Sequence, residues 1–244
     1  MPRFFVNAED EQNGEFLLTG DDARHISRSL RMALGDALTL SDGEGNEYLC
    51  RLTAFSDDCV TATVETRRKG ATEPPVYIRL FQAYPKSDKL EYIIQKAVEL
   101  GVSEIVPFYS EFCVKRPEAS RFDKLRERHD RIAEEAAKQC GRSRLPRVAS
   151  PVSYTEMLRL ASESDTVFFC YEGEGTLSLP DAVSAIPTPK SLSVIVGSEG
   201  GFSTREVMLA REARARLVGL GPRILRCETA ATAVLSCLSY AYEL

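Results

Sequence analysis

The sequence predicts an α/β protein in two parts: a small β-rich domain over residues 1–70 and a mostly parallel α/β domain over residues 76–244. Residues 1–70 hold short runs that alternate apolar and polar positions between turn residues. The segment RRKGATEPP (67–75) combines charge, glycine and two prolines, as linkers do. Beyond it, strand-like and helix-like runs alternate at lengths typical of a parallel sheet covered by helices.

The N-terminal elements are short strands and one helical turn. The strand-like runs are EFLLTG, DALTLSDGEGNEYLCRLTAF and CVTATVETR, with turn chemistry at Asp42-Gly43 and Gly45-Asn46. In DDARHISRSLRM, Ala23, Ile26 and Leu30 share one helical face. This pattern predicts a small β-barrel-like domain.

The second part begins with a strand, VYIRLFQAY (76–84). Asp88 and Glu91 have the spacing of a capping box, so we expect a helix there, and Gly101 ends it. Further strands are expected at 103–110, 165–171, 191–196 and 215–221, and further helices at 121–140, 203–215 and from about Thr229.

Composition limits the class of protein. The 244 residues include seven widely spaced cysteines without a C-x-x-C pair and only two histidines, so we expect reduced thiols and no metal site. The start, MPRFFVNAEDEQ, lacks the features of a signal peptide, and no stretch resembles a membrane span. We therefore expect a cytoplasmic protein with no membrane association.

The net charge of −5 conceals two basic segments. Residues 115–147 hold 11 Lys+Arg against 6 Asp+Glu, and residues 205–226 hold 6 against 2. Local patches of this kind set the field that a polyanion meets. A solvated helix face paired internally would explain much of the first segment, but RSRLPR (142–147) carries no acid at all.

Three predicted strand ends are rich in glycine: CYEGEG (170–175), VGSEGG (196–201) and GLGPRILRCETA (219–230). Glycine lets backbone groups approach a ligand closely. Any one of them could be a tight turn, but three at successive strand ends of one sheet could line one pocket. The spacing of VGSEGG matches neither a dinucleotide fingerprint nor a P-loop, and no nucleophile elbow or metal constellation is present.

At these motifs the sequence resembles a known family. QAYPKSDKLEYIIQKAVELGVSEIVPFYSEFCVKR, EEAAKQCGRSRLPRV, VIVGSEGGFSTRE and LGPRILRCETAATA are similar, in order, to the 16S ribosomal RNA uracil-N3 methyltransferases, the RsmE family of the SPOUT superfamily. The resemblance implies a SPOUT-type parallel sheet with a C-terminal trefoil knot, preceded by a PUA-like β-barrel that binds RNA. It also implies S-adenosylmethionine as cofactor, a homodimer, and 16S rRNA or the small ribosomal subunit as partner.

The resemblance transfers site residues position by position. The cofactor positions are Tyr171, Val196, Gly197, Glu199, Gly200, Gly201, Leu220, Gly221, Ile224, Leu225, Thr229 and Ala230, with Glu172 beside Tyr171. Two positions depart from the family: Ser198 replaces a common proline, and Cys227 stands where threonine is usual.

Uracil N3 is protonated at neutral pH, so its methylation needs that proton removed or the developing anion stabilised. Arg226 is the candidate that stabilises the uracil oxygens. Glu228 is a candidate proton acceptor, with a helix-cap carboxylate as the alternative. The candidates for phosphate contacts are Arg28, Arg31, Lys86, Arg142 and Arg144.

Two other classes of function remain open at this point. An α/β oxidoreductase would carry its glycine fingerprint after the first strand of the sheet, where the sequence instead reads AYPKSDK. An RNA-binding module without catalysis would fit the small barrel but gives no reason for three glycine loops.

Overall fold

The computed structural model describes residues 1–56, 58–114, 116 and 122–243. The chain divides into two compact units. The barrel unit comprises Met1–Glu73 with Ala137–Leu145, and the α/β unit comprises Pro74–Ala136 with Pro146–Leu244. Residues 137–145 therefore pack with the barrel, although the sequence gives no sign of it.

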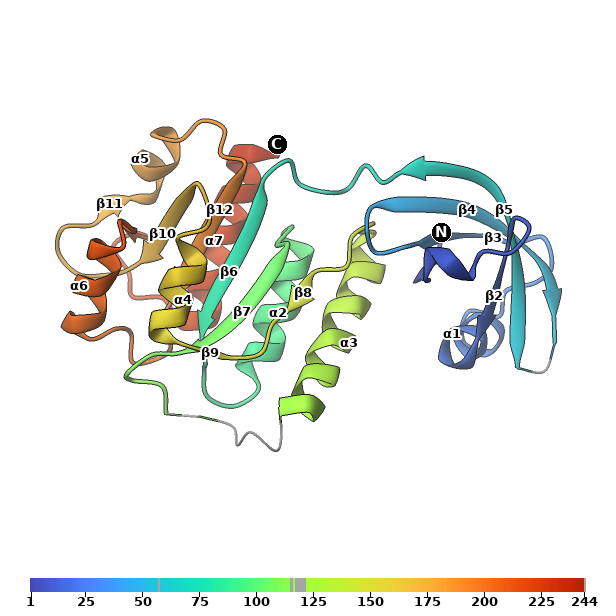
Figure 1. Ribbon diagram of the computed structural model, residues 1–244, viewed down its shortest axis with the longest axis horizontal. Helices are drawn as coiled ribbons and strands as arrows, with labels where there is room; N and C mark the ends of the chain where they lie inside the picture. The colour runs from blue at the N-terminus through green and yellow to red at the C-terminus, as the bar shows by residue number, and fades with distance from the viewer. Residues whose placement is uncertain (57, 115, 117–121, 244) are drawn as a thin grey trace. The chain divides into compact units, whose positions relative to one another are not determined.

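The barrel unit is built on a curled five-stranded sheet (Figure 1) with the strand order β1-β3-β4-β5-β2. All pairings are antiparallel except that of β1 with β3. Its elements are β1 (Arg3–Phe5), the 3-10 turn η1 (Ala8–Asp10), β2 (Glu15–Thr19), α1 (Gly20–Arg24), the π-helical turn η2 (His25–Ser29), β3 (Ala37–Ser41), β4 (Asn46–Phe55) and β5 (Cys59–Lys69). Alternate residues of the strands point into one core around Phe16, Leu38 and Leu52.

The α/β unit has a parallel sheet with the order β11-β13-β10-β12-β6-β7-β8, and β9 also pairs with β7. Its strands are β6 (Tyr77–Ala83), β7 (Glu104–Tyr109), β8 (Arg147–Val148), β9 (Val152–Ser153), β10 (Thr166–Cys170), β11 (Leu177–Ser178), β12 (Ser191–Val196) and β13 (Arg216–Gly219). Its helices are α2 (Lys89–Glu99), α3 (Phe122–Cys140), α4 (Tyr154–Ala161), α5 (Leu179–Ser184), α6 (Thr204–Glu212) and α7 (Cys227–Tyr242). The last residues of α3, from Ala137 on, belong to the barrel unit.

Helices cover both faces of this sheet. α2 packs on α7, and Figure 1 shows α7 behind the sheet and α4 in front of it. The central strands are consequently buried on both faces: every residue of β12 after Ser191 and of β6 after Tyr77 is buried, including the polar Ser193, Arg79 and Gln82. Because the strands are parallel, their C-terminal ends lie at one edge, and the glycine-bearing loops follow β10, β12 and β13 at that edge.

One predicted capping box is wrong and another forms. Asp88 precedes α2 but its side chain makes no capping hydrogen bond. Glu91 instead accepts a hydrogen bond from Arg128 of α3 at 2.7 Å, so its carboxylate does not turn back to Asp88. The capping box lies at α6, where Ser203 and Glu206 exchange both hydrogen bonds.

Candidate active site

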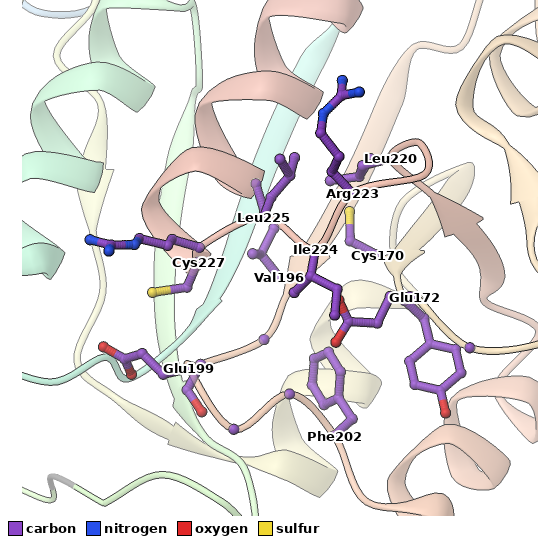
Figure 2. Close-up of a pocket in the computed structure, with 18 of the residues that line it drawn as sticks. Cys170, Glu172, Val196, Glu199, Phe202, Leu220, Arg223, Ile224, Leu225 and Cys227 are labelled. Carbon is purple, nitrogen blue, oxygen red and sulfur yellow. The ribbon is translucent and has the colours of Figure 1, made fainter.

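The three glycine-bearing strand ends surround one cavity of about 450 Å³ in the α/β unit (Figure 2), so the prediction that they line one pocket is confirmed. This volume is in the range of cofactor-sized pockets. The walls come from residues 170–173, 196–202 and 220–230; the individual lining residues are Cys170, Tyr171, Glu172, Gly173, Val196, Gly197, Ser198, Glu199, Gly200, Gly201, Phe202, Leu220, Gly221, Arg223, Ile224, Leu225, Arg226, Cys227 and Ala230.

The wall after β12 is a tight turn in which the Gly201 N–H donates to the Ser198 carbonyl at 3.0 Å. Gly201 has φ +65°, a left-handed conformation that favours glycine. A Cβ at Gly197 would lie 3.0 Å from the Phe202 ring, and a Cβ at Gly200 would lie 2.7 Å from Cβ of Phe112. Both glycines are therefore required by close packing of this loop.

The other two walls contribute apolar side chains and one aromatic. Ile224, on the loop between β13 and α7, is 82% exposed, and Figure 2 shows it directed toward Glu172 and Phe202. Arg223 on the same loop points away from them. On the wall after β10, the Tyr171 N–H donates to the Val218 carbonyl at 3.0 Å, which ties this wall to β13.

A charged cluster lies behind two of these walls. The Lys89 ammonium, at the start of α2, is 3.0 Å from Glu199 Oε1 and 3.1 Å from Glu228 Oε2. Glu199 also accepts from the Lys86 backbone N–H, and the Cys227 thiol donates to Glu228 at 3.2 Å. In Figure 2 the Glu199 carboxylate points away from Ile224 and Phe202.

The cluster shifts the pKa of each of its members. Burial works to raise the pKa of Glu199 and of Glu228, but hydrogen bonds from their own backbone N–H groups and from Lys89 outweigh it, so both pKa values are lowered. The hydrogen bond to Glu199 raises the pKa of Lys89. Burial, the hydrogen bond to Glu228 and the nearby carboxylates raise the pKa of Cys227 to about 12, so the thiol stays protonated at neutral pH.

Most residues singled out from the sequence for the cofactor come together in the cavity wall: Tyr171, Val196, Gly197, Glu199, Gly200, Gly201, Leu220, Gly221, Ile224, Leu225 and Ala230. Thr229 is exposed and lies outside the lining. The candidate catalytic residue Arg226 lines the cavity, whereas Glu228 does not. The motifs did not single out Phe202, whose ring packs on Phe169 at 4.2 Å between centroids.

Glu228 is poorly suited to accept a proton. A carboxylate with a lowered pKa is a weaker base, and this one is bound by an ammonium and a thiol. Its place in the first turn of α7 fits the alternative, a carboxylate at a helix N-terminus.

The candidates for phosphate contacts lie in different places. In the barrel unit, Arg28 is exposed in η2 and Arg31 is exposed just after it; Lys86 is exposed in the loop after β6. Arg144 is exposed, and its side chain lies against Gly45.

Arg142 does not fit the expectation. Its side chain is 4% exposed, and its guanidinium donates to Glu73 at 2.8 Å. The same carboxylate also accepts from the Ser143 and Arg144 backbone N–H groups at 2.9 Å. The role of Arg142 is therefore to hold residues 142–144 in the barrel unit, and we correct its assignment as a phosphate contact.

Among the described residues, no three or more His, Cys, Asp or Glu side chains gather as a metal site would require. In the same part of the chain, no helix combines the length and apolarity needed to cross a membrane.

Comparisons with known proteins agree with this architecture. A family model described as an RNA methyltransferase domain matches residues 72–239, and one described as an RNA methyltransferase PUA domain matches residues 18–65. The chain is 36% identical to ribosomal RNA small subunit methyltransferase E of Bacillus subtilis, over all of this chain and 98% of the relative. Its namesake from Mesomycoplasma hyopneumoniae is 32% identical over 97% of this chain and 98% of its own length.

Solved structures show the same fold. The crystal structure of ribosomal RNA small subunit methyltransferase E from Neisseria gonorrhoeae, bound to S-adenosyl methionine, superposes with a TM-score of 0.87 at 30% identity, covering 99% of this chain and 98% of that one. A Legionella pneumophila methyltransferase in complex with the same cofactor gives 0.88 at 29% identity, covering 98% and 97%. The expected α/β fold with a PUA-like N-terminal domain is thereby confirmed. The chain belongs to the family of the ribosomal RNA small subunit methyltransferases E.

Proposed function

We propose that this protein transfers the methyl group of S-adenosylmethionine to N3 of one uridine in 16S rRNA of the small ribosomal subunit. The observation that carries the proposal is the convergence of three glycine-bearing loops on one cavity, in a chain that matches this family along its whole length. Both relatives with bound cofactor share this fold.

The residues present fit the cofactor. A Cβ at Gly201 or Gly221, both in the cavity wall, would meet nothing within 4 Å, so the wall is open there and backbone amides and carbonyls can reach a flat adenine or a ribose. Val196, Leu220 and Leu225 supply apolar contact. When bound, the cofactor supplies an electrophilic sulfonium methyl group.

We assign the catalytic role to Arg226. Its side chain is exposed at the cavity, and it makes no ion pair with any residue that the structure describes. There its guanidinium can donate to the uracil carbonyl oxygens and stabilise the anion that develops as N3 loses its proton. The target base has to be unpaired or turned out of a helix to reach this position.

We assign different roles to the two domains. Residues 1–70 form the RNA-binding part, with Arg28 and Arg31 among its exposed cations, and residues 76–244 carry methyl transfer. Lys86 and Arg144 are further exposed cations that we assign to phosphates. From the family resemblance we also propose a homodimer, a knotted C-terminal segment and a cytoplasmic location.

Transfer of label from methyl-labelled S-adenosylmethionine to unmodified 16S rRNA, free or in small subunits, tests the proposal. We expect label in the RNA with the wild-type protein and a loss of at least about 100-fold in rate for Arg226→Ala, on the scale of removing one oxyanion donor. Cofactor binding without any transfer to either form of the RNA would contradict it.

A further inference from the structure

Three segments that are far apart in the sequence meet at the Lys89 ammonium. Lys89 is the first residue of α2, Glu199 belongs to the loop after β12, and Glu228 belongs to the first turn of α7. The second and third segments are two of the three walls of the cavity. Lys89 itself is not among the residues that line the cavity.

The arrangement differs from an ordinary surface ion pair. The two carboxylate oxygens share one ammonium at 3.0 and 3.1 Å, so they lie within about 6 Å of each other. The side chains of Lys89, Glu199 and Glu228 are only 29%, 27% and 19% exposed. Without the ammonium, two ionised carboxylates on two different walls would repel each other in a partly buried place.

Each carboxylate is also fixed to its surroundings by a second contact. Glu199 accepts from the Lys86 backbone N–H at 3.2 Å, and Glu228 accepts from the Cys227 thiol at 3.2 Å. Moving the carboxylates apart would break these hydrogen bonds. Repulsion between them would act on the loop after β12, which carries Glu199, and on the first turn of α7, which carries Glu228.

We propose that Lys89 is a positioning residue that holds the loop after β12 and the start of α7 together, and thereby keeps the cavity in the shape that binds the cofactor. The inference rests on the proposed function, since it assigns a role within the same site. It predicts that the contribution of Lys89 depends on the presence of both carboxylates.

Calorimetric titration with S-adenosylmethionine and with S-adenosylhomocysteine tests this. The second ligand lacks the positive sulfonium, so it separates the shape of the cavity from direct charge on the ligand. We expect Lys89→Met to lower the affinity for both ligands about tenfold, and Lys89→Arg to lower it less. Adding Glu228→Gln to Lys89→Met removes one of the two carboxylates that repel each other, so we expect most of the lost affinity to return in this double variant.

Several results would overturn the inference while leaving the proposed function intact. These are unchanged affinity in Lys89→Met, a change seen with S-adenosylmethionine alone, and no recovery in the double variant when thermal unfolding shows it to be folded. If the wild-type protein bound neither ligand, the proposed function itself would fail.

Discussion

Gly200 allows a direct test of how the loop after β12 is held in place. A Cβ added at Gly200 would lie 2.7 Å from Cβ of Phe112, whereas ordinary contacts lie at 3.4–4 Å. The two loops would have to separate by about 0.7 Å, because a Cβ, unlike the end of a flexible side chain, cannot rotate away. The turn that carries Phe112 is itself fixed: the Glu111 N–H donates to Glu206 at 2.8 Å.

We therefore expect Gly200→Ala to cost about 2 kcal/mol in the free energy of unfolding, a shift of about 4–8 °C in melting temperature. The displaced loop should also lower the affinity for S-adenosylmethionine about tenfold, as measured by calorimetric titration. Gly201→Ala is the matched control. A Cβ there meets nothing within 4 Å, but φ is +65°, so it should cost only the strain of the left-handed conformation, about 1 kcal/mol.

The clash makes a specific rescue possible. Phe112→Gly removes Cβ of residue 112, the atom that clashes, and should restore both stability and cofactor affinity to the Gly200→Ala protein. Phe112→Ala keeps that Cβ and should not restore either of them. Neither change should rescue Gly201→Ala. Equal rescue by both changes, or a Gly200→Ala protein that melts and binds like the wild type, would refute this reasoning.

Three further predictions concern charge. Burial works against the charged form of Glu73, but hydrogen bonds and the charge of Arg142 outweigh it and lower the pKa of this carboxyl. The contribution of Glu73 to stability is therefore fully present above its ordinary pKa of 4.5 and is lost as the pH falls through the lowered pKa. Glu73→Gln should destabilise the protein at pH 7 but much less at pH 3.5 in thermal unfolding, and an equal effect at both pH values would contradict this. Arg226→Ala should leave the affinity for S-adenosylhomocysteine within about threefold of wild type while slowing transfer at least about 100-fold; a parallel loss of both would make Arg226 a cofactor ligand instead. Arg28→Ala with Arg144→Ala should weaken RNA binding and lower the slope of log affinity against log salt by about 0.7–0.9 per lost phosphate contact, and an unchanged slope in filter binding would remove them from the interface.

The sequence predicts the main strands and helices of the α/β unit because their apolar patterns are long and regular. The short elements are harder to see. α4 has eight residues and α5 six, and each is defined largely by a serine N-cap and by burial against the sheet. The capping box at Asp88 fails for a tertiary reason, since Arg128 binds the glutamate that would have completed it.

The site shows the same division. The glycine loops are local motifs, so most cavity residues can be read from the sequence. Arg142 cannot, because its partner Glu73 lies 69 positions away, and a basic segment with no local acid resembles an RNA contact. The Lys89 cluster also depends on tertiary structure. Each of its charges is ordinary in its own segment, and the segments meet because β12 pairs with β6 and α2 packs on α7.

The identity of the methylated atom tests the proposed function most directly. Unmodified 16S rRNA, in small subunits and free, would be incubated with the protein and S-adenosylmethionine, then digested to nucleosides and analysed by mass spectrometry against synthetic standards. We predict one 3-methyluridine per 16S molecule, formed at least about 100-fold more slowly when Arg226→Ala replaces the wild-type protein. A methyl group on another base, on a ribose or on another position of uracil would contradict the proposed function, even in a protein that binds the cofactor at this cavity.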